Sequence, residues 1–476
     1  MRHERGYAVR MRRTIFTLAS IVLPLMAAPA AAQQPAERIA APSAKECAAR
    51  RGALAAAVAK AYPGEAAVVV VRTAPKPDHM GTFVPDQDFV YLSGVAEPDT
   101  ALLMAIDASG KVVADELLVP PFSRFAAVWE GTFLAPGEAA AKQTGFAVAG
   151  NVRALGERLA ALCAERDGKR PILIAAKHPA APLGGTTSSA ADAARALGQD
   201  PFDGRSDRQT AALAKFAAAL PGIRIEALEA VLHPLRTIKS PSELALVRAS
   251  TEAAAEAIGE AMRAVKPGLY EYHLAAVARF VLSARGCGTD AYAAIVGAGP
   301  NGCVLHYSAN ARQIAKGDLI VMDYAATLHG YASDVTRTFP ASGKFSEAQR
   351  KLVTDVYEIQ QALIQEVKPG ASLSSLSRRC AELLVARGYR SDHGPSHHVG
   401  LAVHDPSVDV LQPGMVITVE PGAYLRDVGM GCRIEDVVLV TEKGHEVLSK
   451  DVPSHPDAVE AWMRKKSPLG ALLGGR

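Results

Sequence analysis

The sequence predicts two successive domains, an α/β domain followed by an α+β domain, on three observations. The chain has 476 residues, which is more than one hydrophobic core usually organises. Short strand-like runs alternate with alanine-rich helical runs over residues 44–235. A long amphipathic helix and a repeated motif then follow within residues 238–456. We expect a leader over residues 1–32 and a tail over residues 457–476 to flank the two domains.

The composition argues against nucleic acid as a partner. Hydrophobic residues make up 49% of the chain and charged residues 21%, and the formal net charge is only +3. Such a globular chain has no basic excess to hold a polyanion. The six cysteines include no C-x-x-C pair, which argues against a thiolate zinc site. Their spacing selects no disulfide partners.

The first 32 residues have the architecture of a signal peptide. Five arginines among the first 13 residues precede an apolar run that ends in Ala30-Ala31-Ala32. These small residues suit cleavage before Gln33, whereas the run is short for a membrane span and contains Pro24. We therefore expect export to the periplasm or the medium, without a membrane anchor after cleavage. Arg12-Arg13 also fits a twin-arginine signal.

The first domain, over residues 44–235, shows the alternation of an α/β fold. The strand-like runs are EAAVVVVRTA, FVYLSGV, ALLMAIDASG and PILIAA. VRALGERLAALCAERDG, which precedes PILIAA, is typical of a helix. Residues 177–206 are rich in Ala, Gly, Pro and Ser and predict loops around a short helix.

The second domain contains an internal repeat. Ser240-Pro-Ser-Glu predicts the start of a long helix that ends at Pro267-Gly268. Val265-Lys-Pro-Gly recurs as Val367-Lys-Pro-Gly, an offset of 102 residues (367 − 265). Ala-Arg-Gly at 284–286 recurs at 386–388 with the same offset (386 − 284). The implied unit of helix, KPG turn, helix and strands therefore occurs twice.

The first half of the repeat predicts a β-hairpin with two acidic side chains. GDLIVMDYAATLHGYASDVTRTF is typical of two strands that fold back at LHG. A turn centred between Leu328 and His329 places Asp323 opposite Asp334 on one face of the sheet. Carboxylates in such positions repel unless a cation lies between them, and a metal ion is the commonest solution.

The second half predicts a matching hairpin, ITVEPGAYLRDVGMGCRIEDVVLV. Glu420 and Glu435 are symmetric about the Asp427-Val428 turn and so share a face. Two aspartates and two glutamates then converge on one point, and oxygen donors of this kind suit a two-metal hydrolase with a histidine ligand. The segment HGPSHHVGLAVHD offers four candidate histidines, among which the spacing does not decide: His393, His397, His398 and His404.

Four motifs, in this order, resemble the metallopeptidase family of aminopeptidase P, prolidase and methionine aminopeptidase. They are SDVTRTF, HxxGLxVHD from His397 to Asp405, TVEPG and GCRIEDVVLV. Upstream, FVYLSGVAEPDTALLMAID and FAAVWEGTFLAPGEAAAKQTGF resemble the amino-terminal domain of aminopeptidase P and related prolidases. The resemblance, which ends with VPSHPDAVEAWM, implies an α/β domain of the creatinase/aminopeptidase P type. It also implies an α+β catalytic domain with the pita-bread fold, built from a pseudo-twofold repeat.

The resemblance implies roles for individual side chains. The ligands of a dinuclear site would be Asp323, Asp334, His397, Glu420 and Glu435, with Asp334 and Glu435 bridging the ions. Glu420 would be the general base, and His404 or His306 would donate a hydrogen bond during the reaction. His393 would line the proline pocket and Arg433 would support it. Two divalent ions are implied, with Mn²⁺ favoured over Zn²⁺ or Co²⁺ by the oxygen-rich donors.

One position departs from the family pattern. The usual D-x-G after the first ligand is Asp323-Tyr324-Ala325 here, which places a methyl group near the expected metal site. Every expected ligand is nevertheless present.

The resemblance implies an Xaa-Pro aminopeptidase that acts on small peptides with proline in second position and forms a homo-oligomer. A dedicated pocket is needed because the proline nitrogen carries no hydrogen and restricts the preceding residue. The nearest alternative is a prolidase, which cleaves only Xaa-Pro dipeptides, and Ser396 in HGPSH favours the aminopeptidase. A non-catalytic binding protein of this fold, or a metal-free creatinase-like hydrolase, would not need the five ligands.

Overall fold

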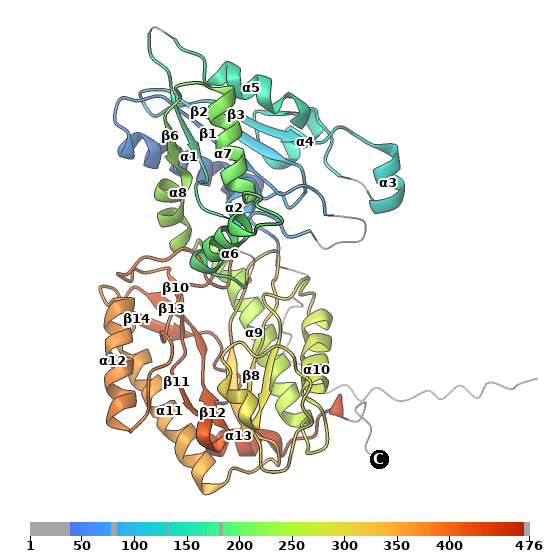
Figure 1. Cartoon of the computed structure of the whole chain (residues 1–476), viewed down its shortest axis with the longest axis vertical. Coiled ribbons are helices and arrows are strands. Elements are labelled where there is room, and N and C mark those ends of the chain that lie inside the picture. The colour runs from blue at the N-terminus through green and yellow to red at the C-terminus, as the bar shows by residue number, and fades with distance from the viewer. Residues whose placement is uncertain (1–38, 78–82, 132, 167, 180–183, 471–476) are drawn as a thin grey trace, which may run out of the picture. The chain divides into compact units, whose positions relative to one another are not determined.

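The first domain of the computed structural model is built on one mixed six-stranded sheet with the order β4-β3-β2-β1-β5-β6 (Figure 1). The structure describes residues 39–77, 83–131, 133–166, 168–179 and 184–470. The strands are β1 (Ala67–Arg72), β2 (Ala101–Ile106), β3 (Val112–Val119), β4 (Val148–Asn151), β5 (Ile172–Ala175) and β6 (Ile225–Ala227). β2 is antiparallel to both of its neighbours, and the β3–β4, β1–β5 and β5–β6 pairs are parallel. The α/β prediction for this domain is confirmed.

Eight α-helices belong to the described part of this domain. They are α1 (Ala44–Ala61), α2 (Gln87–Ser93), α3 (Arg124–Glu130), α4 (Glu138–Thr144), α5 (Leu155–Leu162), α6 (Thr187–Gln199), α7 (Arg208–Ala219) and α8 (Leu228–Thr237). Alternation along β1 divides the apolar residues between the two faces of the sheet. Val69 and Val71 join the large core that continues into the second domain, whereas Val68 and Val70 pack into a smaller core with Leu159 of α5.

The strand predicted at FVYLSGV is wrong, because this segment forms helix α2. The Asp86 carboxylate caps the helix by accepting a hydrogen bond from the Phe89 N–H at 2.9 Å. Gly94 ends it in the left-handed conformation at φ 69°. Phe89, Tyr91 and Leu92 are all buried, so the apolar residues show no clear helical period and resemble a buried strand.

The helices of the second domain reproduce the predicted repeat. They are α9 (Pro241–Ala264), α10 (Glu271–Ala284), α11 (Glu347–Glu366), α12 (Leu373–Ala386) and α13 (Pro456–Met463). Both ends of α10 map onto the ends of α12 at the offset of 102 residues (373 − 271 and 386 − 284). The predicted start of α9 is also confirmed, since Ser240 and Glu243 form a reciprocal capping box.

The strands of the second domain lie between the α9–α10 and α11–α12 pairs in Figure 1. One sheet contains β7 (Ile295–Ala298), β8 (Leu319–Asp323) and β9 (Thr336–Pro340). A second contains β10 (Val416–Val419), β13 (Asp436–Thr441) and β14 (Gly444–Val447), and a ribbon pairs β11 (Gly422–Leu425) with β12 (Met430–Arg433). An isolated bridge between Thr336 and Glu435 joins the two halves.

The first acidic hairpin turns one residue later than predicted. Asp323 pairs with Thr336, and the chain reverses at His329-Gly330. The φ values of these two residues, 48° and 85°, are those of a two-residue type I′ turn. Asp334 is therefore a diagonal neighbour of Asp323 on the same face, and does not lie directly opposite.

The second hairpin has the predicted register. Val419 pairs with Asp436 and Gly422 pairs with Arg433, as the symmetry of Glu420 and Glu435 requires. The two glutamates lie in the irregular step between these strand pairs, where each strand leaves one sheet for the next.

All six cysteines are buried, and none forms a disulfide. In the described ranges, no helix combines the length and the apolar character that a membrane span requires. The leader predicted over residues 1–32 lies outside the described residues. The domain boundaries remain predictions; α8 ends at Thr237 and α9 begins at Pro241.

Candidate active site

All nine residues predicted to form the site line one cavity of about 450 Å³. They are Asp323, Asp334, His397, Glu420, Glu435, His404, His306, His393 and Arg433. Asp323 ends β8 and Asp334 precedes β9, so the first half of the repeat supplies both aspartates. The second half supplies the glutamates and His397, and the cavity therefore lies at the seam between the halves.

A short segment beside β10 places His397 next to Glu420. The Val399 N–H donates to the Val416 carbonyl at 3.0 Å, and the Thr418 N–H donates to the His397 carbonyl at 2.8 Å. These bonds fix the segment as an extra strand on β10, so its side chains share the alternation of the sheet.

Three potential metal ligands form a tight group. The donor atoms of Asp334, His397 and Glu435 all lie within 4.8 Å of one another. His397 Nε2 is 3.4 Å from Asp334 Oδ2 and 3.3 Å from Glu420 Oε1. Asp323 and Glu420 line the same cavity and complete the set of five.

The hydrogen bonds of His397 determine which ring nitrogen faces the carboxylates. Its Nδ1 lies 3.1 Å from the His398 carbonyl oxygen, which can only accept. Nδ1 therefore carries the proton, and Nε2 is the nitrogen available to a metal. His398 points elsewhere: its side chain is buried, its Nε2 contacts the Val408 carbonyl at 3.0 Å, and it does not line the cavity.

Crowding of the carboxylates favours their protonated forms. Burial, with the Asp334 charge, raises the pKa of Asp323 to about 6, and burial raises that of Glu420 to about 7. Burial and the charges of Asp334, Glu420 and Asp323 raise the pKa of Glu435 well above its ordinary value. Although burial opposes it, Asp334 and Glu420 raise the pKa of His397 to about 9. A divalent cation would instead stabilise the ionised carboxylates, so the donor set fits a divalent metal.

Arg433 links the expected proline pocket to the first expected ligand. Its Nη2 donates to Asp323 Oδ2 at 2.7 Å, and its Nη1 donates to the Tyr424 hydroxyl at 3.1 Å. His393 Nδ1 donates to the Gly394 carbonyl at 2.8 Å, so Nε2 accepts from the Tyr424 hydroxyl at 2.9 Å. Burial lowers the pKa of His393 to about 4, which keeps the ring neutral near pH 7.

His404 lies against His397, with ring centroids 4.2 Å apart. Burial and the neighbouring His397 lower its pKa to about 4, so the neutral ring can donate one hydrogen bond. Its Nδ1 is buried and has no hydrogen-bond partner among the described residues. His306, the other expected donor, is exposed along the cavity.

Two family models match the sequence, one for each domain. Residues 47–171 match the aminopeptidase P, N-terminal domain, and residues 245–442 match metallopeptidase family M24. The second domain belongs to metallopeptidase family M24. The predicted creatinase/aminopeptidase P type of the first domain and the pita-bread fold of the second are thereby confirmed.

Relatives of this chain include an Xaa-Pro aminopeptidase and an Xaa-Pro dipeptidase. The Xaa-Pro aminopeptidase of Escherichia coli is 36% identical over 267 residues, which cover 49% of this chain and 60% of that protein. The Xaa-Pro dipeptidase of Pyrococcus furiosus is 34% identical over 231 residues, 47% of this chain and 66% of that protein. The chain thus spans about 60% of the length of the first of these relatives.

Solved structures match a larger share of this chain than these relatives do in sequence. The structure of E. coli aminopeptidase P with the inhibitor Pro-Leu superimposes with a TM-score of 0.73 at 29% identity. The match covers 89% of this chain and 99% of that chain. Both domains of this M24 protein therefore follow the architecture of aminopeptidase P.

Three residues of the M24 site were missed in the sequence. The Thr336 hydroxyl donates to Glu435 Oε2 at 2.6 Å, and the Thr418 hydroxyl donates to Glu420 Oε1 at 3.2 Å. Thr418 is two residues from its glutamate, so strand alternation could have placed it on the same face. The Tyr292 hydroxyl hydrogen-bonds to two expected ligands, but its sequence neighbourhood carries no signal for this contact.

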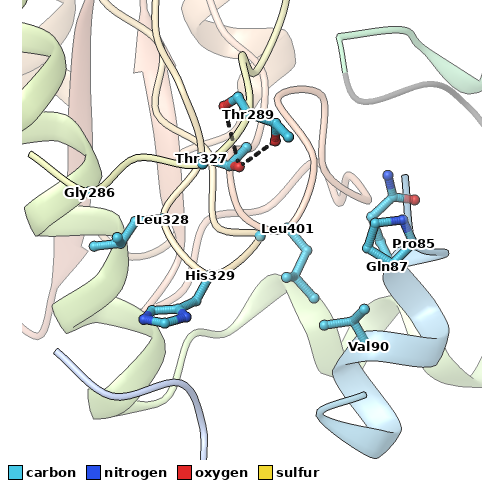
Figure 2. A pocket seen from close by; sticks show the side chains of 11 residues that line it. Pro85, Gln87, Val90, Gly286, Thr289, Thr327, Leu328, His329 and Leu401 are labelled. Atoms are coloured by element: carbon cyan, nitrogen blue, oxygen red, sulfur yellow. Dashed lines mark hydrogen bonds between the residues drawn. The ribbon is translucent and has the colours of Figure 1, made fainter. Parts of the chain in front are cut away.

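A second cavity of about 320 Å³ is lined by residues of α2, by the tip of the first acidic hairpin and by Leu401. Leu401 lines this cavity, whereas Val403 and His404 of the same loop line the first. Figure 2 shows the hydrogen bonds between Thr289 and Thr327 in its wall. The described residues that line it include no acidic or basic side chain other than an exposed histidine, so it offers no metal site.

Proposed function

We propose that this chain is a metal-dependent Xaa-Pro aminopeptidase, which hydrolyses the bond between an N-terminal residue and a following proline. The observation that carries the proposal is the convergence of five potential ligands on one cavity, in a chain with both an M24 domain and an aminopeptidase P N-terminal domain. The aminopeptidase P structure that it resembles holds the inhibitor Pro-Leu. Small peptides with proline in second position are the proposed substrates.

The proposed cofactors are two divalent ions, with Mn²⁺ preferred and Zn²⁺ or Co²⁺ as alternatives. The residues that would hold them are Asp323, Asp334, His397, Glu420 and Glu435. When bound, such ions lower the pKa of water and stabilise negative charge on a carbonyl oxygen. Four carboxylates and one imidazole form a predominantly hard donor set, which supports the preference for Mn²⁺.

The protein supplies proton transfer and orientation. Glu420, whose Oε1 accepts a hydrogen bond from Thr418, would take a proton from the attacking water as the general base. His404 would donate its hydrogen bond to the developing oxyanion or to the leaving nitrogen, with exposed His306 as the other candidate. His393 and Arg433 would shape the pocket for the proline ring. The apolar side chain of Leu305, which lines the same cavity, can pack against that ring.

An Xaa-Pro dipeptidase is the second candidate function. The 34% identity with the P. furiosus dipeptidase supports it, because the two activities share one kind of metal centre. The higher identity with the E. coli aminopeptidase supports the first candidate. A non-catalytic role gains no support, since each of the five expected ligand positions holds a suitable side chain.

The test is peptide hydrolysis by the purified chain with added Mn²⁺. We expect tripeptides of the form Xaa-Pro-Xaa to lose their first residue, at rates above those for Xaa-Pro dipeptides. Glu420→Gln should lower kcat by at least about 100-fold, because a general base contributes this much or more. Cleavage of dipeptides alone would favour the dipeptidase, and turnover of neither substrate would reject both.

We also propose a homo-oligomer, supported by the surface of α3. Phe122, Phe125, Val128 and Trp129 are each between 63 and 74% exposed, and α3 has no buried residue. A contiguous apolar surface of this kind usually marks a protein interface. Light scattering should give a multiple of the monomer mass. The double variant Phe125→Glu, Trp129→Glu should give the monomer, and a monomeric wild-type chain would reject the proposal.

Export to the periplasm or the medium is proposed from residues 1–32 alone. N-terminal sequencing of the protein recovered from an exported fraction should begin near Gln33. Full-length protein confined to the cytoplasm would contradict export.

A further inference from the structure

Four charged side chains connect the first domain to the loop that carries His404. Arg236, in α8, donates from Nη1 to Asp88 Oδ1 of α2 at 2.6 Å. Its Nη2 donates to Asp405 Oδ1 at 2.5 Å, and Lys239 Nζ donates to Asp405 Oδ2 at 3.0 Å. The side chains of Arg236, Asp405 and Lys239 are no more than 5% exposed, so water does not screen these contacts.

Asp405 closes the loop over residues 398–405. Its N–H donates to the His398 carbonyl at 2.9 Å, and its Oδ1 accepts from the Ala402 N–H at 3.3 Å. Gly400 leaves room for the carboxylate, because a Cβ there would lie 2.8 Å from Asp405 Cγ and 3.0 Å from Lys239 Cε. The carboxylate therefore sits inside the loop and fixes its backbone from within.

The same loop sets the position of two imidazoles of the site. The His398 carbonyl that accepts from Asp405 is also within 3.1 Å of His397 Nδ1. His404 directly precedes Asp405, and its own Nδ1 has no hydrogen-bond partner in the described part of the chain. Besides the loop backbone, contacts with the His397 ring and with the Gly184 backbone place the His404 ring.

We propose that Asp405 is a positioning residue that holds His404 in place for the reaction, and that Asp88 of the first domain supports it through Arg236. The inference rests on the proposed peptidase function for its kinetic consequences. In this proposal the first domain helps to hold the active site in place, because Asp88 orients Arg236 for its contact with Asp405.

A double-mutant cycle tests whether Asp405 acts through His404. We expect Asp405→Asn to lower kcat by about 100-fold, the usual effect of a misplacement near 1 Å, with a smaller change in KM. In a His404→Ala background the same substitution should cause a much smaller loss, since only its effect through His397 is left. Equal losses from Asp405→Asn in the two backgrounds would overturn the proposal.

Asp88→Asn provides a milder variant in case Asp405→Asn does not fold. It leaves all groups of the active site in place, and we expect a smaller loss of kcat than with Asp405→Asn. Arg51→Met is the matched control, because Arg51 is a buried arginine of the first domain that pairs with Asp115 and does not line the cavity. An Asp88→Asn variant with unchanged kcat would overturn the role of the first domain.

NMR of histidine-labelled protein separates this proposal from the proposed function. The His404 ring signal, assigned as the one absent from His404→Ala, should shift in Asp88→Asn and Asp405→Asn and stay in place in Arg51→Met. A wild-type chain without Xaa-Pro turnover would reject the function, whereas an unshifted His404 signal in both Asp variants would reject the positioning chain.

Discussion

His397 and His398 are adjacent in the chain, yet their rings have different surroundings. His397 faces Asp334 and Glu420, whereas His398 is fully buried against the Val408 carbonyl. Alternation along the added strand beside β10 explains the difference, because successive side chains point to opposite faces. One ring therefore faces the cavity and the other faces the core.

This contrast predicts different metal contents for two alanine variants. His397→Ala removes an expected ligand and should lower the affinity for the metal by at least about 10-fold, so that less metal stays bound to each chain. His398→Ala should keep the metal and lose folding stability by about 1–3 kcal/mol, since it deletes a buried hydrogen-bonded ring. Metal analysis after gel filtration, with thermal unfolding, checks both. Equal metal loss in the two variants would show that the ligand is assigned incorrectly.

The sequence predicted the residues that line the site better than the residues that hydrogen-bond to them. Every acidic residue and histidine assigned from the motifs lines the cavity, because motif spacing preserves the strand register. Tyr292 could not be found in this way, since its hydroxyl reaches Asp334 at 2.5 Å from the loop before β7 only after the sheet has formed. Contacts between sequence-distant elements leave no local pattern.

At the scale of elements, turns and caps decided where the predictions succeeded. The capping box at Ser240 was visible because its residue types are specific, and α9 begins where expected. The first acidic hairpin was placed one residue early, because His329 takes a positive φ, which is uncommon for residues other than glycine. Helix α2 was missed because buried apolar residues on several sides hide the helical period.

Helix α2 predicts a pH-dependent stability difference. Burial, with the neighbouring Asp88, raises the pKa of its cap Asp86 from 3.8 to about 6. The folded protein therefore favours the neutral carboxyl, and this stabilisation is lost as the pH rises through about 6. Asn caps helices as well as Asp and carries no charge. Asp86→Asn should raise the unfolding free energy on the order of 1 kcal/mol at pH 7.5 and leave it unchanged near pH 4. Thermal melts at both pH values check this, and a stabilisation confined to low pH would contradict the assignment.

Close backbone contact between β12 and the turn before His306 predicts a second effect. A Cβ on Gly431 would lie 2.5 Å from the Gly302 carbonyl carbon and 3.1 Å from the Cys303 nitrogen. Gly431→Ala should therefore displace this turn, lower stability by about 1–3 kcal/mol and reduce kcat/KM. Gly317→Ala, where a Cβ meets nothing within 4 Å, is the control. Similar melting temperatures for the two variants would contradict the contact.

At the scale of the whole molecule, the site exists only where the two halves of the repeat meet. The first half provides two aspartates and the second provides two glutamates and a histidine. The repeat itself was predictable from an offset of 102 residues, which both ends of α10 and α12 reproduce. The series of ion pairs from Asp88 through Arg236 to Asp405 was not predictable, because a buried ion pair has no periodic pattern in the sequence.

Because both halves of the repeat contribute expected ligands, bound metal should stabilise the folded second domain as a whole. The unfolded chain does not assemble the five expected ligands, so a metal at about 100 times its dissociation constant should add about 2.7 kcal/mol to the unfolding free energy. Treatment with a chelator should lower the melting temperature, and Mn²⁺ should restore it. Asp334→Asn should remove the response to Mn²⁺. A melting temperature that is independent of metal in the wild-type chain would contradict a shared site.

The six buried thiols provide a probe of how the chain opens. Burial raises the pKa of Cys163 and Cys287 to about 11 and that of Cys380 and Cys432 to about 12, so these thiols are unreactive while the protein is folded. Alkylation by a thiol reagent therefore requires transient opening of the surrounding core. Cys163 lies in the first domain and Cys380 in the second, so mass spectrometry of the labelled peptides would time the opening of each domain separately.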